Sequence, residues 1–161
     1  MKTTPAFLIP ILLIGTVLAA CTHPSKEGSE TSPVGKTVLS ASALVSARDK
    51  VNFTEHVKPI LQTKCVMCHN HKTLPGRMSL ENRKRALSPG ATGTPIVPGQ
   101  PEQSLLLTNI KSAHAHVNAM PPVGERITED ELAVLTKWIR DGAAWPEGSA
   151  GRLNPEWTPR E

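Results

Sequence analysis

The residues best suited to chemistry lie together at Cys65-Val66-Met67-Cys68-His69. Two thiols three positions apart, followed directly by a histidine, form the attachment pattern of a c-type haem. Each thiol can add to one vinyl group of the porphyrin. The tight turn between them brings the imidazole under the iron, a metal that imidazole commonly binds. We therefore predict one covalent haem c attached through Cys65 and Cys68, with His69 as an axial iron ligand.

Two other chemistries use closely spaced cysteines. A structural zinc site needs four ligands, and here Cys65, Cys68, His69 and His71 would have to supply them from seven consecutive residues without a second half-site. A redox-active Cys-x-x-Cys pair normally lies near a βαβ pattern, and no such pattern is visible. The spacing and its context favour haem over both.

The second axial position of the iron needs a ligand from elsewhere in the chain. Met120 lies 51 residues beyond His69, far enough to pass around the edge of a porphyrin. Pro121 and Pro122 follow it, and prolines lose little entropy when a loop becomes ordered. A thioether favours Fe(II) and raises the reduction potential. Met120 is the predicted ligand, and His114 and His116 are its competitors because imidazole also binds haem iron.

The third cysteine, Cys21, follows an apolar run from Phe7 to Leu18. Residues 1–20 are predicted to be a secretory signal, too short for a confident membrane span. The small residues before Cys21 resemble the bacterial lipobox, in which this cysteine is lipidated and becomes the first residue. The alternative is an ordinary signal peptide, but that would leave an unpaired thiol in an oxidising compartment. We expect a lipid anchor in the bacterial cell envelope, with the protein facing the periplasm or the cell surface.

Composition indicates how the remaining chain is organised. Residues 21–50 are rich in Ser, Thr, Gly, Pro and Ala, which predicts a flexible tether with at most a weak helix over 38–47. One folded domain is expected over 51–147, followed by an extended tail over 148–161. With 3% aromatic residues and 15 prolines the core is thin, and a buried porphyrin would supply an apolar centre. A net charge of +4 without a basic patch interleaved with aromatics gives no indication of nucleic-acid binding.

Apolar spacing predicts helices on both sides of the cysteine motif. The first carries Phe53, Val57, Ile60 and Leu61, and Pro59 either kinks it or makes it begin at Lys58. Shorter helices are expected over 81–87 and from Pro101 to Ile110. The last begins at a capping box formed by Thr128 and Glu131, carries apolar residues through Ile139, and ends at Gly142.

Three stretches together resemble the small c-type cytochrome domain common in planctomycete and verrucomicrobial secreted proteins. They are Phe53 with Lys58-Pro59-Ile60-Leu61 and the cysteine motif, Ile96 through Leu106, and Met120-Pro121-Pro122 with the final helix. The resemblance covers residues 51–147. It implies an all-α, class I cytochrome c-like fold around one haem c with long Pro- and Gly-rich loops, and it implies His69 and Met120 as the axial ligands. His71 departs from the family, which tends to have Gly-Pro there.

An iron with two protein ligands has no open position for a substrate, so the sequence favours single-electron transfer to a redox partner protein over catalysis. One alternative is a haem c protein with a labile distal site, acting as a sensor or an enzyme. Another is a non-haem metal-binding lipoprotein. No catalytic triad, phosphate loop or pair of acid–base carboxylates is evident.

Overall fold

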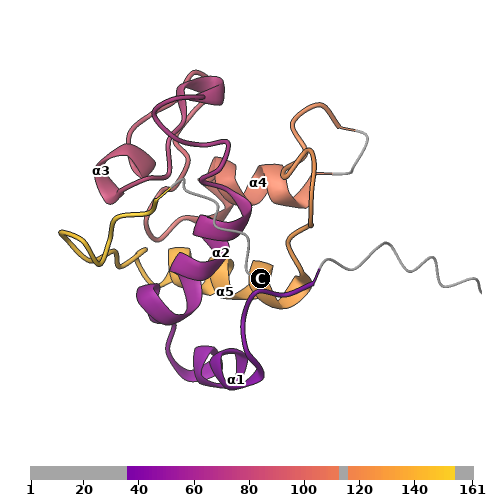
Figure 1. Ribbon diagram of the computed structural model, residues 1–161, viewed down its shortest axis with the longest axis vertical. Coiled ribbons are helices and arrows are strands. Elements are labelled where there is room, and N and C mark those ends of the chain that lie inside the picture. The colour runs from indigo at the N-terminus through magenta and orange to yellow at the C-terminus, as the bar shows by residue number, and fades with distance from the viewer. Residues whose placement is uncertain (1–35, 113–115, 155–161) are drawn as a thin grey trace, which may run out of the picture. The chain divides into compact units, whose positions relative to one another are not determined.

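Helices are the regular elements of residues 36–112 and 116–154, the parts of the chain that the computed structural model describes. No strand occurs in these ranges, and the predicted all-α class is confirmed. None of the helices in this part of the chain has the length and apolar character to cross a membrane. In chain order they are α1 (Ala41–Asp49), a π-helical turn (Phe53–Val57), α2 (Lys58–Lys64), a 3-10 turn (Pro75–Arg77), α3 (Arg83–Ala86), a second 3-10 turn (Pro101–Gln103), α4 (Leu105–Lys111) and α5 (Glu129–Arg140) (Figure 1).

Helix α5 forms as the sequence predicts. The Thr128 hydroxyl accepts from the Glu131 backbone N–H at 3.2 Å, and the Thr128 N–H donates to the Glu131 carboxylate at 2.9 Å. This capping box satisfies two backbone donors at the helix start. The buried side of α5 carries Val134, Leu135 and Trp138, and the helix packs against α1, α4 and the π-helical turn.

The helix before the cysteine motif begins in two steps. The Asn52 side chain caps the π-helical turn by accepting from the N–H groups of Thr54 and Glu55 at 2.8 and 3.1 Å. Helix α2 then begins at Lys58, with Pro59 in its first turn, where the missing N–H has no helical partner to lose. Of the two alternatives predicted for Pro59, a kinked helix or a helix that begins at Lys58, the structure shows the second, and α2 leads directly into Cys65.

Three aromatic rings join the start of the folded unit to its end. Phe53 packs against Trp138 and Trp145, with ring centroids 5.9 and 4.5 Å apart. The Trp145 indole N–H donates to the Gly151 carbonyl at 2.6 Å. A Cβ on Gly151 would collide with the Pro146 carbonyl oxygen, so this tight return of the chain requires glycine.

The folded unit extends beyond both predicted boundaries. Among the described residues, the buried core includes positions on both sides of the range 51–147, and Cys21 lies outside the described residues. The described parts of the stretches predicted as a tether (21–50) and as a tail (148–161) contribute residues to this core. Leu39 and Ala47 are buried on one side of the chain, and Leu153 is buried on the other. These residues complete a core that is poor in aromatics, through long-range contacts that local composition does not reveal.

Candidate haem site

An apolar cavity of about 270 Å³ lies between the Cys65–His69 turn and the loop that follows α4. It brings together the two cysteines, the histidine and the methionine that the sequence singles out, although Met120 is far from the others along the chain. Its walls are formed by Lys64, Cys65, Met67, Cys68, His69, Pro75, Ile110, Met120, Pro121, Pro122, Val123 and Ile127.

The cysteines reach the cavity because the end of α2 tightens into a turn. The N–H groups of Cys65 and Val66 both donate to the Leu61 carbonyl, at 3.0 and 2.9 Å. The His69 N–H then donates to the Cys65 carbonyl at 2.9 Å. Val66 is fully buried beneath this turn, which fixes the turn to the core while the residues on either side of it face the cavity.

The Asn70 side chain stabilises this turn through hydrogen bonds to the backbone, a role that the sequence analysis missed. Its buried side-chain amide donates to the carbonyls of Val66 and Met67 at 2.9 and 2.8 Å. Its side-chain oxygen accepts from the N–H groups of Lys72 and Thr73 at 2.8 and 3.2 Å. The signal in the sequence is an asparagine directly after the motif, a residue type that forms such local turns.

His69 is anchored through its backbone, and its ring Nδ1 has no hydrogen-bond partner among the described residues. Its backbone carbonyl accepts from the Leu80 N–H at 2.9 Å. Burial lowers the pKa of the ring, and the nearby Met78 backbone opposes the shift. Even so, no described group meets hydrogen-bond geometry at the buried Nδ1. A neutral imidazole is the form that binds a metal.

The opposite wall is a loop fastened at both ends. On one side the Met120 N–H donates to the Asn109 carbonyl in α4 at 3.1 Å. On the other, the Arg126 carbonyl accepts from the Lys64 ammonium at 2.7 Å. His116 is exposed and is not among the residues that line the cavity, and His114 lies outside the described residues.

A buried ion pair stands at the edge of the cavity, and the sequence analysis missed it too. The Lys64 ammonium lies 2.8 Å from the Glu131 carboxylate, and their side chains are 2% and 0% exposed. Glu131 also accepts from the Val38 N–H at 2.8 Å and from the Thr37 hydroxyl at 3.2 Å. One carboxylate thus joins three parts of the fold: the strap formed by Thr37 and Val38, the start of α5 and the end of α2. Only the capping-box part of this network has a local sequence signal.

The charges of Lys64 and Glu131 affect the pKa of Cys65. The pKa of the partly buried Cys65 thiol is raised to about 12, first by burial and then by the Glu131 carboxylate, with Lys64 acting in the opposite direction. Cys68 is exposed. The two thiols therefore differ in access, with Cys65 deeper in the fold.

The residues present fit a haem c. Two thiols, an imidazole with an unpartnered ring nitrogen and a thioether face one apolar cavity, which is the donor set for thioether attachment and two axial bonds. Zinc is less well served, because residues 36–112 and 116–154 contain no group of three or more His, Cys, Asp or Glu side chains arranged to hold a metal. In particular, His71 turns away and bonds Glu81, with Nδ1 2.6 Å from the carboxylate.

The helical fold and this cavity define a cytochrome c-like domain. Comparison with known proteins agrees, because residues 65–124 match the Planctomycete cytochrome C family. The matched segment carries the site residues, and the resemblance found in the sequence is confirmed. The chain is also 27% identical over 143 residues to hydrazine synthase subunit alpha of Kuenenia stuttgartiensis. That alignment covers 70% of this chain and 18% of the subunit. No solved structure matches the chain.

Proposed function

We propose that the folded unit carries one haem c, attached through Cys65 and Cys68 with His69 and Met120 as axial ligands, and that it transfers single electrons to a redox partner protein. The observation that carries the proposal is that all four residues line one apolar cavity. When bound, the haem supplies an iron that accepts and returns one electron. The chain supplies attachment, two ligands and exclusion of water.

The ligand assignment rests on what each candidate can reach. Met120 lines the cavity, and its loop is fastened at Asn109 and at Arg126, so little ordering remains to be done on ligation. His116 is exposed outside the cavity lining. A neutral thioether in an apolar site favours Fe(II), and the expected carrier therefore has a raised potential.

The attachment is tested by covalent retention of haem. The intact mass of the processed protein should exceed that of the polypeptide by one haem, which should survive acid–acetone extraction. Cys65→Ser/Cys68→Ser should lose this retention, whereas the control Ser149→Ala, at an exposed position, should keep it. Haem that extracts freely from the parent protein would overturn the proposal.

Met120 ligation is tested by spectroscopy. Oxidised parent protein should show the weak long-wavelength absorption of a thioether–Fe(III) bond, and Met120→Ala should lose that band, lower the potential and admit cyanide or carbon monoxide. His116→Ala should leave all three unchanged. If His114→Ala or His116→Ala opens the iron while Met120→Ala does not, the ligand is histidine and the carrier has a lower potential.

A second candidate is a haem c site whose distal ligand is labile. Its support is the similarity to a subunit named as part of a synthase, although this chain spans less than a fifth of that subunit. Rapid carbon monoxide binding by the reduced parent protein would favour this function, and slow or absent binding would favour electron transfer.

For location we propose lipid attachment at Cys21 in a bacterial cell envelope. The support is the apolar leader and the small residues before a cysteine that the haem site does not use. Cys21→Ser should release the protein from the membrane fraction into the soluble periplasmic or extracellular fraction. Unchanged membrane association of this variant would refute the anchor.

A further inference from the structure

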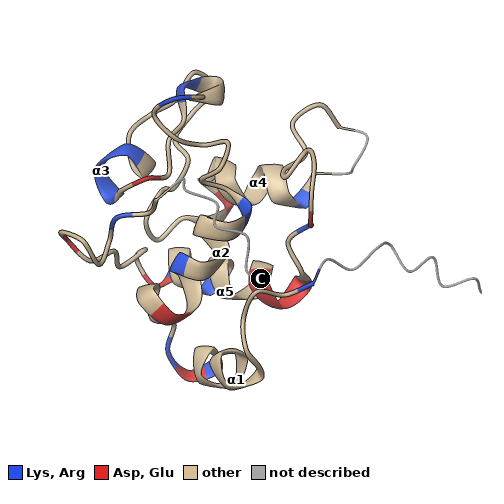
Figure 2. Ribbon diagram, viewed as in Figure 1, with Lys and Arg blue, Asp and Glu red and all other residues tan. Residues whose placement is uncertain are grey.

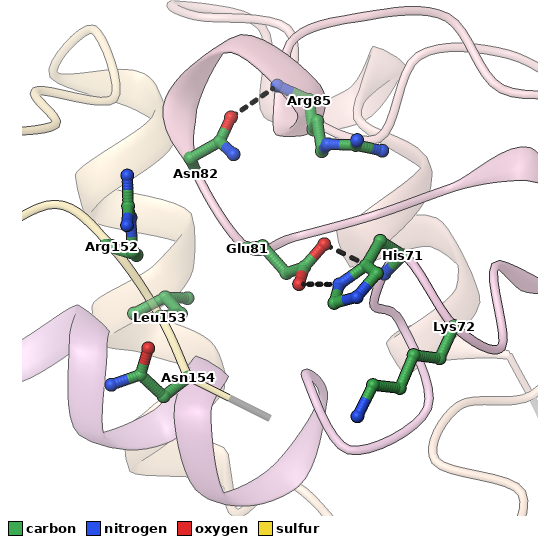
Figure 3. A pocket seen from close by; sticks show the side chains of 8 residues that line it. All are labelled: His71, Lys72, Glu81, Asn82, Arg85, Arg152, Leu153 and Asn154. Carbon is green, nitrogen blue, oxygen red and sulfur yellow. Dashed lines mark hydrogen bonds and ion pairs between the residues drawn. The ribbon is translucent and has the colours of Figure 1, made fainter. Parts of the chain in front are cut away.

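A second cavity, of about 460 Å³, shares no lining residue with the haem cavity (Figure 3). Three segments form its walls: His71 and Lys72 after the motif, the stretch from Glu81 to Arg85, and the chain from Arg152 to Asn154. In Figure 3 the last segment faces His71 and Lys72, with Glu81 between them. The volume is within the range of small-molecule sites, about 300 to 1,000 Å³.

The cavity has a fixed frame. Glu81 joins all three segments, because its carboxylate bonds the His71 N–H and ring at 2.8 and 2.6 Å and its carbonyl accepts from the Leu153 N–H at 2.8 Å. The Ser79 hydroxyl completes the carboxylate's partners at 2.9 Å. Both carboxylate oxygens are therefore occupied inside the protein, and Glu81 serves as a structural brace.

The other charged side chains among the described residues that line this cavity are basic. Lys72, Arg85 and Arg152 line it, and none of them forms an ion pair with an acidic side chain in the described part of the chain. Figure 2 shows basic residues gathered on α3, which provides Arg85. With one braced carboxylate against three cations, the lining carries an excess of positive charge. The amides of Asn82 and Asn154 add further N–H donors.

We propose that this cavity binds a small organic or inorganic anion carrying two or more carboxylate or phosphate groups. Guanidinium groups bind such oxygens with two parallel hydrogen bonds, and an ammonium adds a compact charge. A singly charged anion would leave most of these donors unused, whereas a polyanion can meet cations from all three segments at once. The site is separate from the haem cavity, and its existence does not depend on the proposed electron transfer.

Isothermal titration calorimetry on the purified full-length protein tests this at low ionic strength, with citrate, pyrophosphate, inorganic phosphate and acetate as probes. Saturable one-to-one binding of citrate or pyrophosphate, much tighter than that of acetate, is expected. The better of the two identifies carboxylate or phosphate as the favoured chemistry. If neither citrate nor pyrophosphate saturates the protein, the proposal is overturned.

Substitutions separate a site from general attraction to a basic protein. Arg85→Gln and Arg152→Gln should each weaken binding of the better probe about tenfold, the loss of one charge-assisted contact. Arg48→Gln and Arg140→Gln remove the same charge at exposed positions outside this cavity and should change affinity less than about twofold. Equal weakening in all four variants would show a net-charge effect and overturn the site. Circular dichroism confirms that each variant is folded.

Discussion

Replacing Lys64 with methionine removes the ammonium from the buried ion pair while keeping an apolar chain of similar length. In the parent the ammonium bonds the carbonyls of Lys36 and Arg126, at 3.0 and 2.7 Å, and the Glu131 carboxylate at 2.8 Å. The substitution leaves a fully buried carboxylate without its cation and two carbonyls without their donor.

The expected cost follows from what Glu131 retains. Breaking a buried pair by removing one partner typically destabilises a protein by about 3 to 5 kcal/mol. The carboxylate keeps the N–H groups of Val38 and Thr128 and the Thr37 hydroxyl, which points to the lower end of that range. We expect the free energy of unfolding to fall by about 3 kcal/mol, a large part of the 5 to 15 kcal/mol typical of a domain.

Urea unfolding of the haem-loaded protein measures this loss. The control is Lys137→Met, which removes an exposed i,i+4 pair with Asp141 at 2.9 Å and should cost less than about 0.5 kcal/mol. Lys64→Met/Glu131→Gln removes both charges while keeping a side chain able to complete the capping box, so its cost should be below the sum of the single variants. A Lys64→Met protein within about 1 kcal/mol of the parent, or strictly additive costs, would refute the reasoning.

Three further predictions concern individual contacts that hold the fold together. Glu81→Gln should destabilise the protein by about 1 to 3 kcal/mol at neutral pH. Burial alone would raise the Glu81 pKa, but hydrogen bonds from His71 and Ser79 hold it below its usual value, so this loss of stability should shrink as the pH falls below about 4.5. A loss that does not depend on pH in urea unfolding would contradict this prediction. Asn70→Ala should lower the free energy of unfolding by about 2 to 4 kcal/mol and reduce the yield of haem-loaded protein, because four backbone groups lose their partner. The control is Asn118→Ala, at an exposed position, and equal yields from the two variants would argue against a role of Asn70 in holding the turn. Gly151→Ala should lower the free energy of unfolding by about 2 to 3 kcal/mol, measured by thermal unfolding, because the new Cβ would collide with the Pro146 carbonyl. Ser149→Ala, at a nearby exposed position, should have no effect, and an equally neutral Gly151→Ala would contradict the close approach of the chain at this glycine.

The features that the sequence predicts well are those with local signals. The capping box at Thr128 and Glu131, the helix start at Lys58 and the placement of Met120 at the same cavity as the cysteine motif follow from nearby residues or from reach along the chain. The attachment turn itself is formed by residues that are close in sequence.

Other features depend on pairings that no local pattern specifies. Lys64 and Glu131 are 67 residues apart, and Val38 and Glu131 are 93 apart. A serine- and alanine-rich stretch such as 37–49 predicts a tether by composition, yet Leu39 and Ala47 are buried, and α1 packs against both α5 and the π-helical turn. The return of Leu153 to Glu81 likewise needs the aromatic cluster that turns the chain at Trp145.

The strap formed by Thr37 and Val38 also has a mechanical meaning. A pull on the chain ahead of Lys36 enters the folded unit through the bonds of this strap to Glu131 and through the Lys36 carbonyl on Lys64. The same ammonium bonds the Arg126 end of the Met120 loop. Lys64 also directly precedes Cys65 in the chain. Tension applied at the N-terminal end would therefore reach both walls of the cavity through this one residue, the methionine loop through its ammonium and the cysteine turn through its backbone.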